Sequence, residues 1–135
     1  MSKSQFPMPN KISNDKKYDL IERTSAFGEA VIDFLKIIPK NEITKPLISQ
    51  CVRSATSIGA NYMEADCAES KKDFRHKIGI CKKESKETMY WMRMLAREVD
   101  KEKNQCRILW KESQELTLIF SATINTLDKN NKKPK

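Results

Sequence analysis

The sequence predicts an all-α protein, an antiparallel up-down four-helix bundle. Residues that break helices are scarce, with 3 glycines and 5 prolines among 135 residues, so the helices should be long and the turns few. Four segments carry apolar residues at helical spacing, and no segment shows the sustained alternation typical of a strand. The connections between these segments are short, which favours antiparallel neighbours around one core.

The first expected helix spans residues 19–38 and is ended by Pro39. The second begins near Thr44, a residue type that can cap a helix, and has Pro46 in its first turn, where proline is tolerated. Each has one apolar stripe that should face the core. The two stripes are Leu20, Thr24, Phe27, Val31, Phe34, Leu35 and Ile38, and Ile48, Cys51, Val52, Ala55, Ile58, Gly59 and Tyr62.

The third expected helix runs from Ser70 to about Lys101. It opens with "SKKD", which resembles a capping box with an aspartate in place of the usual Glu or Gln. The fourth covers residues 104–127, with its apolar positions at Leu109, Leu116, Ile119, Phe120, Ile124 and Leu127. We therefore expect one domain at 19–127, between flexible basic tails at 1–18 and 128–135.

Much of the positive charge belongs to the expected tails. The net charge is +8, and residues 1–17 and 128–135 each contribute +3, which leaves +2 for the body. Nucleic-acid affinity would therefore depend on charges sorted onto one face. No apolar run is long enough to span a membrane, and no secretory signal is visible. The four cysteines lack metal-clip spacing, so we expect reduced thiols, no metal, no cofactor and a cytoplasmic location.

The third helix divides lengthwise into three sectors at about 100° per residue. One is the core seam, an apolar row that runs along the whole helix. The second is acidic and contains Trp91 together with Asp73, Ile80, Glu84, Glu87 and Glu98. The third is basic. The core seam comprises Phe74, Ile78, Cys81, Ser85, Thr88, Met92, Leu95 and Val99, and the basic sector comprises Lys72, Arg75, His76, Lys82, Lys83, Lys86, Tyr90, Arg93 and Arg97.

Four polar residues share one face of the second helix: Arg53, Ser57, Asn61 and Glu64. An enzymatic role has little support, because a nucleophile needs an adjacent base and the one histidine, His76, lies in the basic sector of another helix. We therefore expect no catalytic residues. A seam between helices or between subunits is the favoured interpretation, since polar pairs can fix register and partner choice.

Four motifs resemble one known family: "IPK" at 38–40, "RSATSIGANYMEA" at 53–65, "SKKDF" at 70–74 and "KKESKETMYWMRML" at 82–95. It is the family of small four-helix-bundle proteins encoded by intervening sequences within 23S ribosomal RNA genes. The resemblance covers about residues 20–127. It implies an up-down bundle that assembles into a ring-shaped homopentamer. A related group, the accessory variability proteins of diversity-generating retroelements, associates as a basic pentamer with a reverse transcriptase and nucleic acid.

Two sets of site residues follow. A homo-oligomeric subunit interface is expected at Arg53, Ser57, Asn61, Glu64, Glu84, Glu87 and Trp91. Non-sequence-specific binding of RNA or DNA backbone is expected at Lys72, Arg75, Lys82, Lys83, Lys86, Tyr90, Arg93 and Arg97. The alternative is an oligomeric scaffold that binds a protein partner, such as a reverse transcriptase, without nucleic acid.

Overall fold

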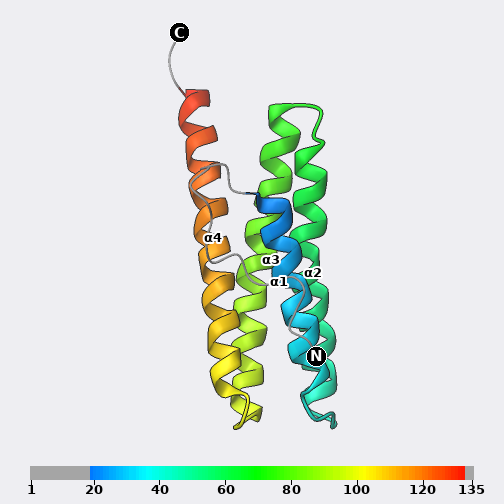
Figure 1. The fold of residues 1–135 in the computed structure, drawn as a ribbon. Helices are drawn as coiled ribbons and strands as arrows, with labels where there is room; N and C mark the ends of the chain where they lie inside the picture. The colour runs from blue at the N-terminus through cyan, green and yellow to red at the C-terminus, as the bar shows by residue number, and fades with distance from the viewer. Residues whose placement is uncertain (1–18, 133–135) are drawn as a thin grey trace.

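The computed structural model describes residues 19–132, which form four helices in an up-down bundle. The helices are α1 (Leu20–Lys36), α2 (Thr44–Asp66), α3 (Lys71–Glu98) and α4 (Lys103–Lys132). Each packs against the next in the chain, and α1 also touches α4 (Figure 1). The predicted fold class is confirmed. The N-terminal tail predicted at 1–18 lies outside the described residues.

The helix ends follow local capping chemistry. Ser70 caps α3, because its hydroxyl accepts the backbone N–H of Asp73 at 3.0 Å, as the "SKKD" motif predicts. At the start of α2 the expected cap is wrong: Asn41, not Thr44, accepts the free N–H groups, those of Ile43 at 2.8 Å and Thr44 at 2.9 Å. The Thr44 hydroxyl accepts the N–H of Asn41 in return. Thr44 therefore completes a reciprocal capping box from inside the helix.

Two predicted boundaries differ from the structure. Helix α3 ends at Glu98 and not near Lys101, because Val99 is extended. Helix α4 continues beyond the predicted end at Leu127 to Lys132, so residues 128–132, expected in a flexible tail, are helical. Arg75 of α3 holds Asp128 through two hydrogen bonds of 2.7 and 2.9 Å, which ties this part of α4 to the bundle.

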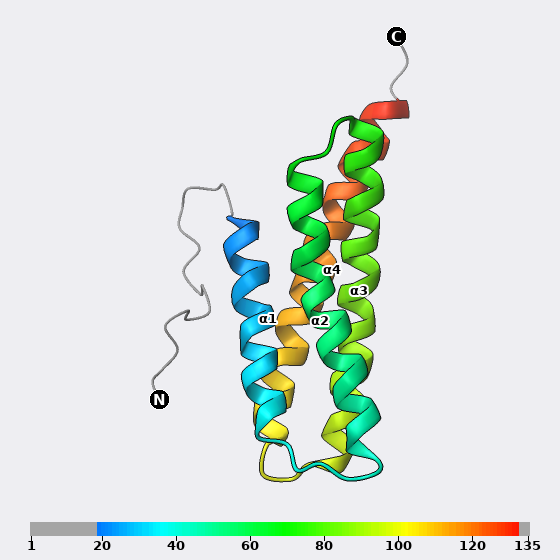
Figure 2. The ribbon, with the colours of Figure 1, turned by 90° about the vertical axis from the view of Figure 1, so that its right-hand side faces the viewer.

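The core lies where the predicted stripes meet. Its largest fully buried side chains include Phe27 of α1, Ile58 of α2, Leu95 of α3 and Phe120 of α4. Small hydroxyl residues let the helices approach closely at its centre, and Ser54 of α2 lies 2.8 Å from the hydroxyl of Thr88. Because α1 is the shortest helix, one end of the bundle contains only α2, α3 and α4 (Figure 2).

Gly59 lies at a close contact between α2 and α1. A Cβ atom at Gly59 of α2 would lie 3.3 Å from the hydroxyl oxygen of Thr24 in α1. That oxygen already donates to the Leu20 carbonyl at 2.8 Å, so Thr24 has little freedom to move. The absence of a side chain at residue 59 therefore sets how closely α1 lies against α2.

Candidate functional site

The polar face of α2 meets the acidic sector of α3 within a single chain. Arg53 forms ion pairs with Glu84, at 3.3 Å, and with Glu87. The indole N–H of Trp91 also donates to Glu87, at 2.9 Å. The structure thus brings together four of the residues that sequence analysis assigned to an interface between subunits.

The other three residues of that set are also engaged within the chain. Glu64 pairs with Lys77 at 2.6 Å. Ser57 and Asn61 donate to backbone carbonyls one turn earlier in their own helix, both at 2.8 Å. The polar face therefore forms a seam between α2 and α3, and its role between subunits stays a prediction.

The seam changes the acid–base behaviour of Glu87. The pKa of Glu87 is lowered from 4.5, first by the hydrogen bond from Trp91 and then by Arg53. A lowered pKa means that the ionised form stabilises the folded chain above pH 4.5, and that this contribution is lost as the pH falls through the folded-state value.

We therefore expect Glu87→Gln to lower the free energy of unfolding at pH 7 by less than about 1 kcal/mol, because exposed ion pairs are screened by water. Urea unfolding of both proteins at pH 7 and pH 3 measures this. The difference between them should shrink at pH 3. An equal difference at both pH values would contradict the role of the charge.

The predicted basic sector of α3 is mostly exposed but is not uniform. Lys72, Lys83 and Lys86 are exposed, whereas Lys82 is half-buried. Arg75 forms an ion pair with Asp128, so part of its charge is offset. At the other end of the sector the exposed Tyr90, Arg93 and Arg97 lie beside a groove.

This cationic groove has a volume of about 900 Å³ and lies between the C-terminal part of α3 and the N-terminal part of α4. Its floor is apolar and is formed by Met89, Met92, Ala96, Cys106 and Trp110. Its rim carries five exposed cations and one exposed aromatic residue. The rim comprises Arg93, Arg97, Lys103, Arg107, Lys111 and Tyr90.

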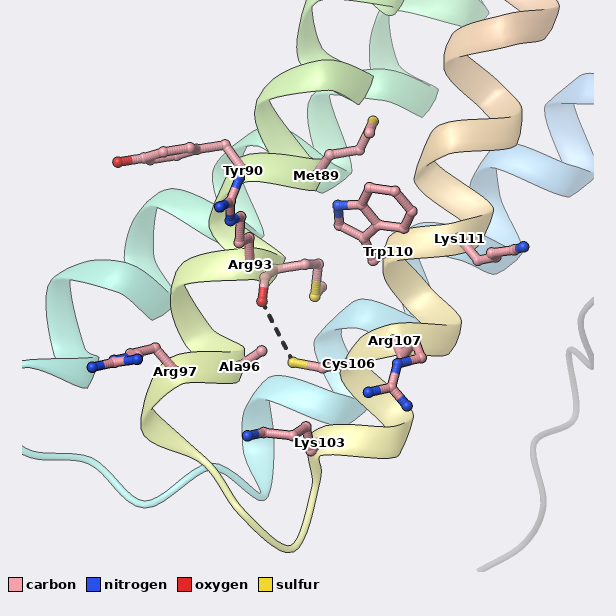
Figure 3. Close-up of a pocket in the computed structure, with 11 residues that line it drawn as sticks. Met89, Tyr90, Arg93, Ala96, Arg97, Lys103, Cys106, Arg107, Trp110 and Lys111 are labelled. Carbon is pink, nitrogen blue, oxygen red and sulfur yellow. Dashed lines mark hydrogen bonds between the residues drawn. The ribbon is translucent and has the colours of Figure 1, made fainter.

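Figure 3 shows how these side chains lie. Trp110 is between the two helices, next to Met89, while Lys111 extends away on the far side of α4. Below Trp110 the Cys106 thiol donates to the Met92 carbonyl at 3.6 Å. Burial raises the pKa of this thiol to about 11, so Cys106 is a packing residue and not a nucleophile at neutral pH.

No carboxylate lines the groove, and within residues 19–131 none of its five cations forms an ion pair. The acidic residues Glu98, Asp100 and Glu102 lie in or next to the turn between the helices, and, after burial, the charge of Glu102 contributes to the raised pKa of Cys106. Lys103 and Arg107 also stand at the start of α4, where positive charge is disfavoured by the helix dipole. The lining of the groove is therefore positively charged, which would favour a bound anion.

Only part of this candidate site was predicted from the sequence. Tyr90, Arg93 and Arg97 were assigned to it, but Lys103, Arg107, Lys111 and Trp110 of α4 were not. A signal was present, because residues 103, 107 and 111 recur at intervals of four and so share a helix face. What the sequence did not show is that this face borders the basic sector of α3.

Two further properties concern the described part of the chain. Within residues 19–132 no helix combines the length and apolar character needed to cross a bilayer. Over the same range, no three His, Cys, Asp or Glu side chains are grouped so as to hold a metal ion.

The fold and the groove define a class of protein: an up-down four-helix bundle with a cationic surface between its last two helices. The family model described as 23S rRNA-intervening sequence protein matches residues 16–127, so the chain belongs to that family. This confirms the resemblance drawn from the sequence motifs.

A solved structure from Bacteroides thetaiotaomicron VPI-5482, a protein of unknown function from the S23 ribosomal protein family, is similar. Its TM-score is 0.70 at 29% identity, over 78% of this chain and 95% of that one. No curated protein matches the chain.

Proposed function

We propose that this chain is a non-enzymatic nucleic-acid-binding protein, which holds the backbone of RNA or DNA in the cationic groove. The observation that carries the proposal is that five exposed cations lie along one groove that no carboxylate lines, with the side chains of Arg97 and Lys111 directed outward (Figure 3). Phosphate groups supply the missing negative charge, and their contacts with Lys and Arg add up along a backbone.

The spacing of the cations suits a repeating anion. Arg93 and Arg97 lie one turn apart on α3, and Lys103, Arg107 and Lys111 continue at the same interval on α4. Each step of four residues corresponds to about 6 Å along a helix. Exposed Lys and Arg side chains read no base identity through phosphate contacts, so we propose binding without sequence specificity.

Salt dependence of binding tests this proposal. Fluorescence anisotropy with a labelled RNA hairpin, a DNA duplex and a single strand should give micromolar or tighter affinity in 50 mM salt. If about five phosphates are contacted, affinity should fall by roughly two orders of magnitude in 200 mM salt. Absence of binding to all three probes at 50 mM salt would overturn the proposal.

The alternative function, a scaffold for a protein partner, draws on the same groove, because an apolar floor with a cationic rim also suits an acidic amphipathic helix. An acidic peptide of matched charge in the anisotropy experiment separates the two. Tighter binding of the peptide than of every nucleic acid would favour the scaffold.

The homo-oligomer implied by the family resemblance remains a proposal. A closed ring would repeat the groove by symmetry and multiply its phosphate contacts. Sedimentation equilibrium gives the mass of the assembly, and a pentamer is the expected result.

A further inference from the structure

We propose that the groove selects single-stranded nucleic acid, with one unpaired base stacked on Trp110. This inference rests on the proposed function and adds to it the class of strand that the site accepts. It arises from the floor of the groove, whereas the proposed function arises from the charges on its rim.

The indole N–H groups of the two tryptophans, Trp91 and Trp110, differ in their hydrogen-bond partners. The N–H of Trp91 donates to Glu87 at 2.9 Å, so that ring is fixed in the seam between α2 and α3. The N–H of Trp110 has no acceptor among residues 19–132, and it is not a buried unpaired atom, so it is open to the groove. A base or a phosphate oxygen in the groove would accept this hydrogen bond in place of water.

The surroundings of Trp110 suit a flat aromatic ring. Met89 lies beside it, and thioether side chains adapt their shape to a bound group (Figure 3). Arg93 and Arg107, on opposite helices, border the same space and could hold the phosphates on either side of the base. Tyr90 extends away from α4, and its ring contacts Trp91 with 5.0 Å between the ring centroids, so it is not directed toward Trp110 (Figure 3).

A duplex cannot use this floor. Neighbouring helices in a bundle lie about 8–10 Å apart, so Trp110 sits in a space far narrower than a duplex. Bases inside a duplex are also stacked on one another and would have to be unpaired, at a cost, before reaching the ring. A single strand presents unstacked bases without that cost.

The test compares three probes in 50 mM salt: a single-stranded DNA 12-mer, the same strand with abasic sites throughout, which has the same charge, and the 12-mer duplex, which has twice that charge. We expect the single strand to bind about tenfold more tightly than the abasic strand, which corresponds to stacking of one base. Trp110→Ala should abolish this tenfold difference in affinity, whereas Trp110→Phe should retain part of it. The phenylalanine variant keeps an aromatic ring at this position and so serves as the control if the alanine variant does not fold.

A second measurement follows the ring directly. Trp91→Phe leaves Trp110 as the single tryptophan, since the chain has two. Its fluorescence should be quenched by the single strand and unaffected by the abasic strand. Equal affinity for the single strand, the abasic strand and the duplex would overturn the inference and leave the proposed function standing. No salt-sensitive binding of any probe would overturn both.

Discussion

Arg23→Ala is expected to lower the free energy of unfolding by about 3 kcal/mol, because it leaves the largely buried carboxylate of Glu112 without its partner. The Arg23 side chain is only 10% exposed. Its guanidinium donates to both oxygens of Glu112, at 2.7 and 2.9 Å, and to Glu115 at 3.1 Å. The hydrogen bond to Glu112 is also the main reason why the pKa of Arg23 is raised. This cluster joins α1 to α4.

The chain contains a matched control for burial. Arg75 binds Asp128 with the same two distances, 2.7 and 2.9 Å, but both side chains are largely exposed. Arg75→Ala should therefore change the stability little, since water screens the pair. Thermal unfolding followed by circular dichroism compares the variants, and Arg23→Ala should lower the Tm by at least about 10 °C. Equal effects of the two substitutions would show that burial does not decide the contribution.

A third variant separates the buried charge from the packing. Replacing Arg23 and Glu112 together by methionine removes both charges and retains apolar volume between α1 and α4. This double variant should be much more stable than Arg23→Ala, because no carboxylate then remains buried without a partner. A double variant as unstable as the single one would indicate that the lost contacts, and not the unpaired charge, cause the defect.

Reversing three groove cations, Arg93, Lys103 and Arg107, to glutamate is expected to weaken nucleic-acid binding on the order of 100-fold in 50 mM salt. The slope of log affinity against log salt should fall by roughly 2–3, about one for each phosphate contact removed. The fold should tolerate the change, since all three side chains are exposed. Negative charge at the start of α4 is also favoured by the helix dipole.

The matched control reverses three exposed cations of α3 that lie outside the groove: Lys72, Lys83 and Lys86. It alters the net charge by the same amount, so any general electrostatic effect is shared. If the groove is the site, this control should weaken binding several-fold at most. An equal loss in both variants would mean that the nucleic acid follows the whole basic sector of α3, as sequence analysis proposed, and not the groove.

The charge of a residue in the basic sector of α3 does not by itself show what surrounds it in the structure. Arg75 and Arg93 look equivalent in sequence, because both lie in the basic sector of α3. In the structure Arg75 is held by Asp128 of α4, whereas Arg93 borders a groove that no carboxylate lines. The difference depends on which part of α4 lies opposite each turn of α3.

The sequence by itself determined the four helices, the stripe that each buries and the family. Helical periodicity and capping are local properties, so Phe27, Ile58, Leu95 and Phe120 could be assigned to the core from spacing alone. The motifs at 53–65 and 82–95 indicated the family that the match over residues 16–127 confirms.

Only the tertiary structure decided which polar residues meet. Arg23 pairs with Glu112, which is 89 positions away in the sequence. Trp110 and Arg93 line the same groove because α3 and α4 run antiparallel at one particular register. Spacing within a helix gives the face of a residue but not the helix that covers that face. That choice depends on the packing of the entire core, in which small residues such as Gly59 set how closely the helices approach.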